Sequence, residues 1–211
     1  YDCINVYAKN TIFWVIRIFG RNTRLGNIFC VLFINSISCS NNTIEVKKRF
    51  KNMSDFNTAD LCDEYSKIKI ADPIFNLYGK KKKFMGKIRT VIAIEDNSYV
   101  KELVDTRVDG DVMVIEGKGS TKCALLGDNL AKTASENGWS GFVINGYIRD
   151  SEIISTISIG IKALNTMPKK SNKNNVGQFK KDLNFAGVLF QEGNFLYSDS
   201  DGIIISEEKL I

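Results

Sequence analysis

The chain of 211 residues is 44% hydrophobic and contains only 2 prolines, so it is long enough to bury one sizeable core and is not compositionally disordered. Its net charge of +5, from 29 basic and 24 acidic residues, gives only weak support to a nucleic-acid partner. The chain contains no histidine, which excludes Ser-His-Asp and Cys-His triads, histidine-ligated zinc and catalysis by an imidazole. Any catalysis must therefore use carboxylates, Lys, Arg, Tyr, Cys or a metal held by oxygen atoms.

Residues 1–52 differ in composition from the rest and are expected to form an N-terminal extension. Two apolar runs, at 12–16 and 28–37, are each shorter than the ~20 residues that cross a bilayer, so no membrane span is expected. A basic stretch, an apolar run and then small residues are typical of a secretory or organelle-targeting leader. An extra helix or a mis-assigned start is the alternative, and localisation stays open between cytoplasm and organelle. The Asn- and Lys-rich stretch 41–52 predicts a solvated linker, which places the globular domain at 53–211.

The five cysteines include no Cys-x-x-Cys pair, and three of them fall in the first forty residues. Neither a zinc knuckle nor a disulfide framework is indicated. Cys62 and Cys123 are interpreted as small buried apolar residues.

From Thr58 onward, helical and extended patterns alternate, with no internal repeat. A short helix is expected at 58–65, a strand at 87–94, a helix at 97–104 and a buried strand at 111–116.

The next helix follows a Gly-rich loop at 116–120. Its apolar face is expected to hold Leu126, Leu130, Ala131 and Ala134. Asp128 can cap the start of this helix and Gly138 can end it. Later buried strands are expected at 141–145, 159–164, 186–190 and 202–206. This order of elements predicts an α/β fold, as a three-layer or β/β/α single domain.

Two segments suggest phosphate binding only superficially. The loop Gly-Lys-Gly-Ser-Thr at 117–121 lacks the first glycine of a phosphate-binding loop, which is separated from the Gly-Lys pair by four residues. The lysine run 80–83, beside Tyr78 and Phe84, is interpreted as a solvated turn, with phosphate contact as the alternative.

The strongest constellation combines Arg149 and Asp150, directly after the strand that begins at Gly141, with the turn at 127–130. In an α/β domain both segments lie near strand ends and can meet at one crevice. A helix start at 128–130 offers unpaired N–H groups to a carboxylate, and an Arg can bind a second carboxylate or a carbonyl oxygen by forked hydrogen bonds. Asp150 can hold Mg²⁺ or Mn²⁺, which keeps several waters and needs few protein ligands. A plain surface ion pair is the alternative interpretation.

Two motifs carry a resemblance to a known family: ALLGDNLA at 124–131 and, some twenty residues later, NGYIRD at 145–150. With TADLCDEY at 58–65 and the stretch 176–206, they resemble the RraA-like family. That family contains class II aldolases that cleave 4-hydroxy-4-methyl-2-oxoglutarate and RraA-type ribonuclease regulators.

The resemblance implies a swivelling β/β/α fold, a homotrimer or hexamer with sites at subunit interfaces, and cleavage of a small oxo acid to release pyruvate. Oxaloacetate decarboxylation is the implied side activity, and a divalent cation (Mg²⁺ or Mn²⁺) is the implied cofactor. No nucleic-acid partner is expected.

The resemblance also assigns roles by position. The turn that receives the substrate matches Gly127, Asp128, Asn129 and Leu130. Arg149 matches the substrate-binding arginine, Asp150 the metal ligand, and Asp128 a carboxylate that orders water beside the metal. On this resemblance, Arg149 and the metal stabilise a pyruvate enolate, and the water that Asp128 orders acts as the base.

The chain departs from the family pattern in two places. Family aldolases usually carry an acid three residues beyond the metal ligand, where this chain has Ile153, with Glu152 one place early. Outer support for the metal is therefore expected to be weaker. Lysines 80–83 replace small residues after the first strand, which is expected to change the preferred substrate size.

The alternative function is a regulator that binds and inhibits an RNase E-like endonuclease without chemistry, and a catalytically idle scaffold is a third possibility. In the regulator branch the metal-ligand position can be non-acidic. Asp150 at that position therefore favours the enzyme.

Overall fold

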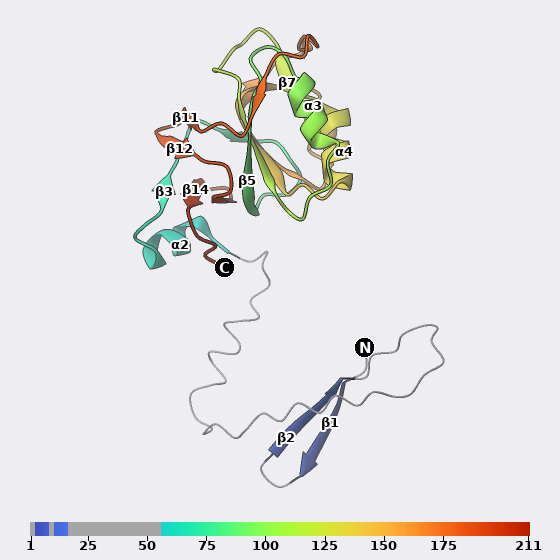
Figure 1. The fold of residues 1–211 in the computed structure, drawn as a ribbon, viewed down its shortest axis with the longest axis vertical. Helices are drawn as coiled ribbons and strands as arrows, with labels where there is room; N and C mark the ends of the chain where they lie inside the picture. The colour runs from blue at the N-terminus through green and yellow to red at the C-terminus, as the bar shows by residue number, and fades with distance from the viewer. Residues whose placement is uncertain (1–2, 9–10, 17–55) are drawn as a thin grey trace, which may run out of the picture. The chain divides into compact units, whose positions relative to one another are not determined.

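The computed structural model describes residues 3–8, 11–16 and 56–211, in two compact units that meet in sequence between Lys51 and Asn52 (Figure 1). The first unit contains an antiparallel hairpin of β1 (Cys3–Ala8) and β2 (Thr11–Ile16). The apolar run at 12–16 thus lies in a strand, and an extra helix there is ruled out. The run at 28–37 and the linker at 41–52 lie outside the described residues.

The second unit is built on four central parallel strands. Their order is β5 (Phe84–Ile92), β6 (Val112–Glu116), β8 (Gly141–Ile148) and β9 (Gly160–Thr166). Residues 112–115 of β6 are all buried. Parallel strands covered on both faces are typically such unbroken runs of Val and Ile, which explains why the sequence pattern revealed this strand.

Shorter strands extend this sheet, which has ten strands among the described residues. On the β5 side, antiparallel neighbours continue as β13 (Phe195–Ser198), β14 (Ile203–Ser206) and β3 (Lys69–Ile70). On the β9 side the edge strand is β4 (Asn76–Leu77), while β10 (Gln178–Phe179) pairs with β5 and β7 (Ala124–Leu126) pairs with β8. A separate hairpin joins β11 (Leu183–Phe185) and β12 (Val188–Phe190).

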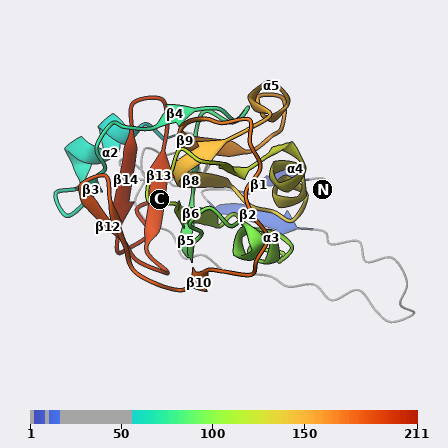
Figure 2. The ribbon, with the colours of Figure 1, turned by 90° about the horizontal axis from the view of Figure 1, so that it is seen from above.

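Different elements cover the two faces of the central strands (Figure 2). On one face lie α3 (Ser98–Val104) and α4 (Asp128–Glu136), whose buried Val100, Val104, Ala131 and Ala134 join a core with Trp139 and Phe142. On the other face, residues of the β11–β12 hairpin and of β13 and β14 form a second core. A smaller cluster lies under α2 (Thr58–Glu64). This arrangement confirms the three-layer β/β/α prediction.

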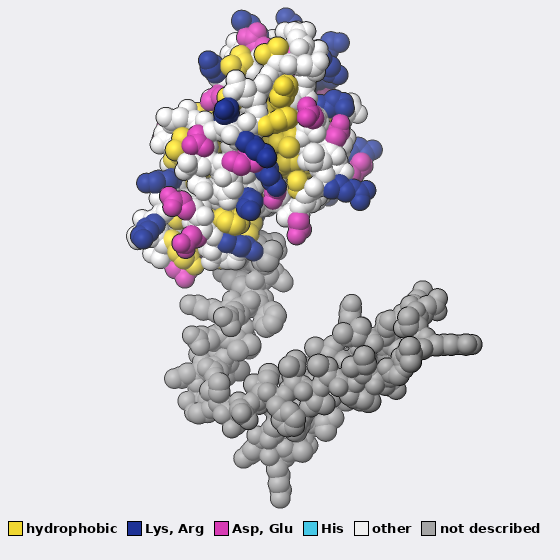
Figure 3. All heavy atoms as spheres, in the orientation of Figure 1, with side chains coloured by type: hydrophobic (Ala, Val, Ile, Leu, Met, Phe, Trp, Pro, Cys, Tyr) yellow, Lys and Arg dark blue, Asp and Glu magenta, His cyan; other side chains and the backbone are white. Residues whose placement is uncertain are grey.

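No helix in the described part of the chain has the length and apolar composition needed to span a membrane. On the face that Figure 3 shows, Lys and Arg side chains are interspersed with Asp and Glu.

The structure corrects three details of the sequence analysis. Leu126 does not share the helical face, because it lies in β7 and pairs with Ile148. Gly127 is the residue that caps α4, and Asp128 is already the first helical residue. The strand expected at 141–145 continues through Gly146 to Ile148, because its end pairs with an additional strand, β7.

Gly138 follows α4 with a positive φ of 88°, as expected for a residue that ends a helix. The interpretation of Cys123 as a buried residue is confirmed. The same interpretation of Cys62 was wrong, because its side chain is only partly buried.

Candidate active site

A cavity of about 240 Å³ lies where β7 and β8 end and α4 begins. The predicted turn at 127–130 and Arg149 line it together, as the position of both segments at strand ends led us to expect. Its other lining residues are Asn97, Lys101, Ala124, Lys170, Ser171 and Lys173. Asp150 is the one predicted residue that does not line the cavity itself.

Arg149 is held in place by its backbone and its side chain. Its N–H donates to the carbonyl oxygen of Leu126 at 3.0 Å, which ties the end of β8 to the end of β7. Its Nε lies 3.2 Å from Oδ2 of Asp150, and about a third of each side chain is exposed, 36% and 34%. An ion pair this exposed adds little to stability, so its consequence is orientation of the two groups.

Asp150 has a left-handed backbone, with φ 57° and ψ 39°, immediately before α5 (Ser151–Ile154). This conformation costs an aspartate roughly 1 kcal/mol or more and is found preferentially at functional sites. It turns the carboxylate back toward Gly127.

Gly127 leaves room for both charged groups. A Cβ atom at this position would lie 3.0 Å from Oδ2 of Asp150 and 3.2 Å from Nε of Arg149. A side chain here would push against both groups, so the glycine of the Gly-Asp-Asn-Leu turn has a steric reason at the site.

The start of α4 supplies hydrogen-bond donors to the cavity. The first N–H groups of a helix have no intrahelical acceptor and lie at the positive end of its dipole, which favours an anion at residues 128–130. The Asp128 carboxylate accepts a 3.2 Å hydrogen bond from Nδ2 of Asn129.

Sequence reasoning missed Asn97, which lines the opposite wall. Its Nδ2 donates to the carbonyl oxygen of Leu125 at 3.1 Å, while its Oδ1 is buried without a hydrogen-bond partner. A buried acceptor of this kind costs free energy unless a ligand or water supplies a donor. Within the sequence Asn97 had no motif to mark it.

The loop that carries Lys170, Ser171 and Lys173 was also missed. Ala124 donates its N–H to the carbonyl oxygen of Lys169 at 2.8 Å, and Asn172 donates to that of Glu95 at 2.9 Å. These bonds fix the loop over the site. The sequence analysis assigned these lysines no role, since nothing local shows that the loop returns to β7.

The positive charges at the cavity outnumber the negative ones. Lys101, Lys170, Lys173 and Arg149 line it. Against them stand the carboxylate of Asp128 and the nearby ones of Asp150 and of Asp105, which pairs with Lys101 at 2.9 Å. The cavity is therefore suited to a small anion with more than one carboxylate.

Several predicted features lie elsewhere. Ile153 is 53% exposed on α5 and does not line the cavity, and the same is true of Glu152. Among residues 56–211, no group of three or more Cys, Asp or Glu side chains could hold a metal ion.

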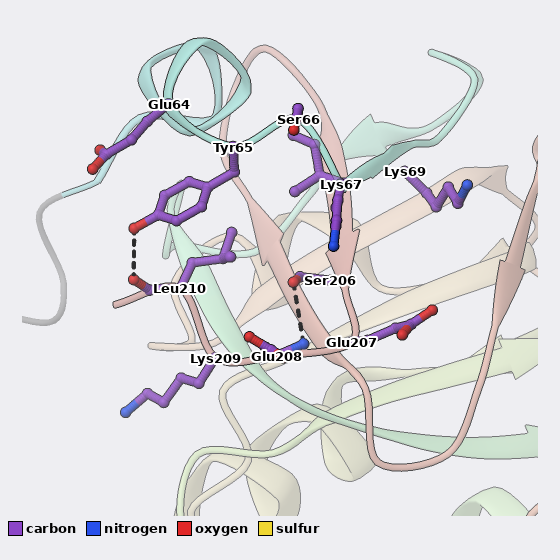
Figure 4. A pocket seen from close by; sticks show the side chains of 11 residues that line it. Glu64, Tyr65, Ser66, Lys67, Lys69, Ser206, Glu207, Glu208, Lys209 and Leu210 are labelled. Atoms are coloured by element: carbon purple, nitrogen blue, oxygen red, sulfur yellow. Dashed lines mark hydrogen bonds between the residues drawn. The ribbon is translucent and has the colours of Figure 1, made fainter.

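A larger cleft of about 710 Å³ lies between residues 64–69 and 206–210 (Figure 4). Tyr65 Oη donates to the carbonyl oxygen of Leu210 at 3.0 Å, and the N–H of Glu208 donates to Oγ of Ser206 at 3.2 Å. Lysine and glutamate side chains both line this cleft, and the first turn of no described helix contributes N–H groups to it, unlike in the smaller cavity. Size alone therefore does not identify the active site.

Residues 58–205 match the profile of the RraA-like family, described as Aldolase/RraA. The chain belongs to the RraA-like family. All the site residues above lie within the matched segment, whereas the N-terminal extension lies outside it.

Named relatives agree with this membership. A protein of Marinomonas sp. that carries the provisional name 4-hydroxy-4-methyl-2-oxoglutarate aldolase is 49% identical over 152 residues, which cover 72% of this RraA-like chain and 94% of that protein. A protein of the same provisional name from Hahella chejuensis is 45% identical and covers 72% and 94% of the two chains. The structure of the RNA-processing inhibitor RraA from Thermus thermophilis is 36% identical, with a TM-score of 0.72, and the match covers 74% of this chain and 96% of that one.

Proposed function

We propose that this RraA-like protein is a lyase that cleaves 4-hydroxy-4-methyl-2-oxoglutarate, or a related 4-hydroxy-2-oxo acid, to release pyruvate. The observation that carries the proposal is the convergence of Arg149, the start of α4 and two further lysines of one loop on a single small cavity. Decarboxylation of oxaloacetate fits the same chemistry, because loss of CO₂ from that acid also leaves a pyruvate enolate.

The cavity offers separate partners to the two ends of a dicarboxylate. The N–H groups at 128–130 suit the carboxylate beside the keto group, and Arg149 can donate to the keto oxygen. Lys170 and Lys173 then meet the far carboxylate, and the unpartnered Oδ1 of Asn97 can accept a hydrogen bond from the substrate hydroxyl.

The reaction breaks the bond between C3 and C4 of the substrate. The C4 hydroxyl loses its proton and becomes a carbonyl, while the electron pair of the broken bond moves toward C2 and leaves a pyruvate enolate. Arg149 stabilises the negative enolate oxygen where that charge develops. Asp128 positions the water that removes the hydroxyl proton, since no histidine is present. Protonation at C3 then gives pyruvate.

A divalent cation belongs to this proposal, and the residues present fit one kind of site. Asp150 offers hard carboxylate oxygens, and Gly127 leaves space beside them. Because residues 56–211 bring no third acid to this point, the residues fit Mg²⁺ or Mn²⁺ that keeps most of its waters. When bound, the cation would supply positive charge beside the enolate oxygen.

We also propose that the protein works as a homotrimer or hexamer. Large apolar side chains stand exposed on the described domain, among them Ile70 at 61% and Val176 at 61%. Subunit contacts would remove them from water. Size-exclusion chromatography with light scattering tests this assembly.

A second candidate function is inhibition of an RNase E-like endonuclease. The likeness to the RraA structure favours it, because that protein is described as an RNA-processing inhibitor. The two functions differ in their need for Arg149. The lyase needs its guanidinium in the active site, whereas inhibition by binding elsewhere on the surface does not.

Pyruvate release separates the two. We expect pyruvate, detected by coupling to lactate dehydrogenase, from 4-hydroxy-4-methyl-2-oxoglutarate in the presence of Mg²⁺. Arg149→Ala is the matched control, since its surface position should leave the fold intact. No pyruvate from a panel of oxo acids, together with inhibition of a purified endonuclease, would establish the regulator instead.

A further inference from the structure

A second cleft, of about 660 Å³, shares no lining residue with the proposed active site. Phe56, Met85 and Phe195 form its apolar part, and these residues belong to the small core cluster under α2. Lys81, Lys83 and Lys87 line its rim. The cleft thus places an apolar surface directly beside a row of cations.

The row follows from the geometry of β5. Lys83 immediately precedes the strand, and Lys83, Met85 and Lys87 occupy alternate positions, so their side chains leave the same face. Alternate positions in an extended chain lie ~7 Å apart. The cleft therefore presents a cation, an apolar side chain and a second cation at the spacing of every second residue in an extended peptide.

These lysines are not neutralised by neighbouring carboxylates of the described domain. Arg89, Lys101 and Lys122 each have a carboxylate within 4.0 Å. Within residues 56–211, none of the three rim lysines forms such an ion pair, and Nζ of Lys83 donates to the neutral Oδ1 of Asn57 at 2.6 Å. Their charge is available to a ligand.

The acidic residues of the cleft distinguish between a nucleic acid and an acidic peptide as ligands. Asp109 and Asp111 line the cleft, and only Asp111 is neutralised, by Nε of Arg89 at 2.7 Å. The continuous charge of a nucleic acid would meet Asp109 across the cleft, and the two signs of charge balance over residues 56–211, so the domain has no long-range attraction for a polyanion. A peptide can place its few carboxylates against the lysines alone.

We propose that this cleft binds an extended acidic segment of a partner protein, in which every second residue is by turns acidic and apolar, so that both kinds of side chain lie on one face. The carboxylates pair with Lys81, Lys83 and Lys87, and an apolar side chain packs on Met85 and Phe195. The proposed ligand is acidic, whereas the sequence of the N-terminal extension contains more basic than acidic residues. This binding does not depend on the proposed lyase activity.

Fluorescence anisotropy tests the proposal with the full chain and a fluorescein-labelled eight-residue peptide in which every second residue is by turns Asp or Glu and Leu or Phe, with Ser at the positions between. We expect saturable binding that is roughly tenfold weaker in Lys81→Glu/Lys87→Glu, as reversal of two contacting charges implies. Lys132→Glu/Lys180→Glu is the matched control, since both lysines are exposed and lie outside the cleft. Thermal unfolding checks that each double variant is folded.

Three further ligands complete the design. Peptides with Ser in place of the apolar residues, or Lys in place of the acids, should each bind at least tenfold more weakly. A labelled oligouridylate should not compete. Equal binding by the two double variants, competition by the oligouridylate, or no peptide binding at millimolar protein would overturn the proposal.

Discussion

The carboxylate of Asp199 accepts two hydrogen bonds from Thr58, one from its backbone N–H and one from its hydroxyl, each 2.7 Å long. Thr58 is the first residue of α2, whose own N-cap residue, Asn57, makes no side-chain capping bond. A residue 141 positions away therefore caps this helix. The same carboxylate accepts from the N–H groups of Asp201 and Gly202, so one buried acid joins α2 to the turn between β13 and β14.

We expect Asp199→Asn to destabilise the domain by about 1–3 kcal/mol, because it removes a buried charge-assisted cap and leaves donors poorly paired. Urea unfolding measures the loss. Asp201→Asn, at an exposed position of the same turn, is the control and should change the free energy of unfolding little. A loss of equal size in both variants would argue against the capping role.

The pH dependence of stability should change in the same variant. Burial would raise the pKa of Asp199, but the hydrogen bonds from Thr58, Asp201 and Gly202 outweigh it and hold the pKa below its ordinary value. A carboxyl with a lowered folded-state pKa stabilises the fold above its unfolded pKa of about 3.9, and this contribution is lost as the pH falls through the folded-state pKa. Below about pH 4 the wild type should therefore lose more stability than Asp199→Asn.

Lys162 offers the converse prediction. It is only 4% exposed in β9, and within the described domain no carboxylate lies within 4.0 Å of it. Burial lowers its pKa, while Asp199 and Asp201 act at longer range in the opposite direction. The folded state thus disfavours the charged form, and stability should rise as the pH approaches the ordinary lysine pKa of about 10.4.

Lys162→Met should consequently stabilise the domain by about 1 kcal/mol at pH 7, since an apolar side chain of similar length avoids desolvation of the charge. The gain should shrink at alkaline pH, and Lys180→Met at an exposed position should show no gain. Destabilisation by Lys162→Met at neutral pH would mean that its attraction to Asp199 outweighs the cost of burial.

The sequence predicted elements whose pattern is local. The helix at 98–104 and the strand at 112–116 needed only their own periodicity. Leu126 was misplaced because an apolar residue before a helix fits either the helix face or a strand, and only pairing with Ile148 decides. Strand β13 was missed because its side chains alternate between two cores, Leu196 in one and Tyr197 in the other, so the sequence shows no polar face.

The same limit applied to the active site. Arg149 and the turn at 127–130 were expected to meet, because both lie near strand ends in an α/β domain, and both line the cavity. The lysine loop reaches the cavity through isolated bridges, Ala124 with Lys170 and Asp96 with Asn172, that no local pattern encodes. Tertiary pairing therefore supplies the part of the cavity wall that Lys170, Ser171 and Lys173 form.

Removal of divalent cations tests the cofactor part of the proposal. We expect exhaustive treatment with EDTA to abolish pyruvate release and Mg²⁺ or Mn²⁺ to restore it, because the proposed cation supplies positive charge beside the enolate oxygen. The chain has no histidine, so oxygen atoms must hold that cation. Trapping of a covalent adduct by borohydride would show instead that a lysine forms a Schiff base with the substrate.

Gly127→Ala tests the steric role of the turn. The added methyl group would lie 3.0 Å from Oδ2 of Asp150 and 3.2 Å from Nε of Arg149, so both groups must shift by a few tenths of an ångström. Because Gly127 has an extended φ of −129°, alanine fits the backbone and the fold should persist. We expect kcat/KM to fall up to about 10²-fold. Gly193→Ala, where a Cβ meets nothing within 4 Å, controls for loss of a glycine, although its φ of 92° will lower its stability.

The sharpest expectation concerns Asp150 and Arg149 together. Asp150→Asn removes charge without volume, so Mn²⁺ binding measured by calorimetry should weaken, and turnover should fall by several orders of magnitude, while circular dichroism stays unchanged. Arg149→Lys keeps the charge but loses the forked geometry, which should lower kcat/KM roughly 10²- to 10³-fold while Mn²⁺ binding persists. The two losses should not add, because both residues serve one charged intermediate and lie 3.2 Å apart. The double variant should thus be little worse than Asp150→Asn alone. Full activity in either single variant would place the chemistry elsewhere and favour the endonuclease inhibitor.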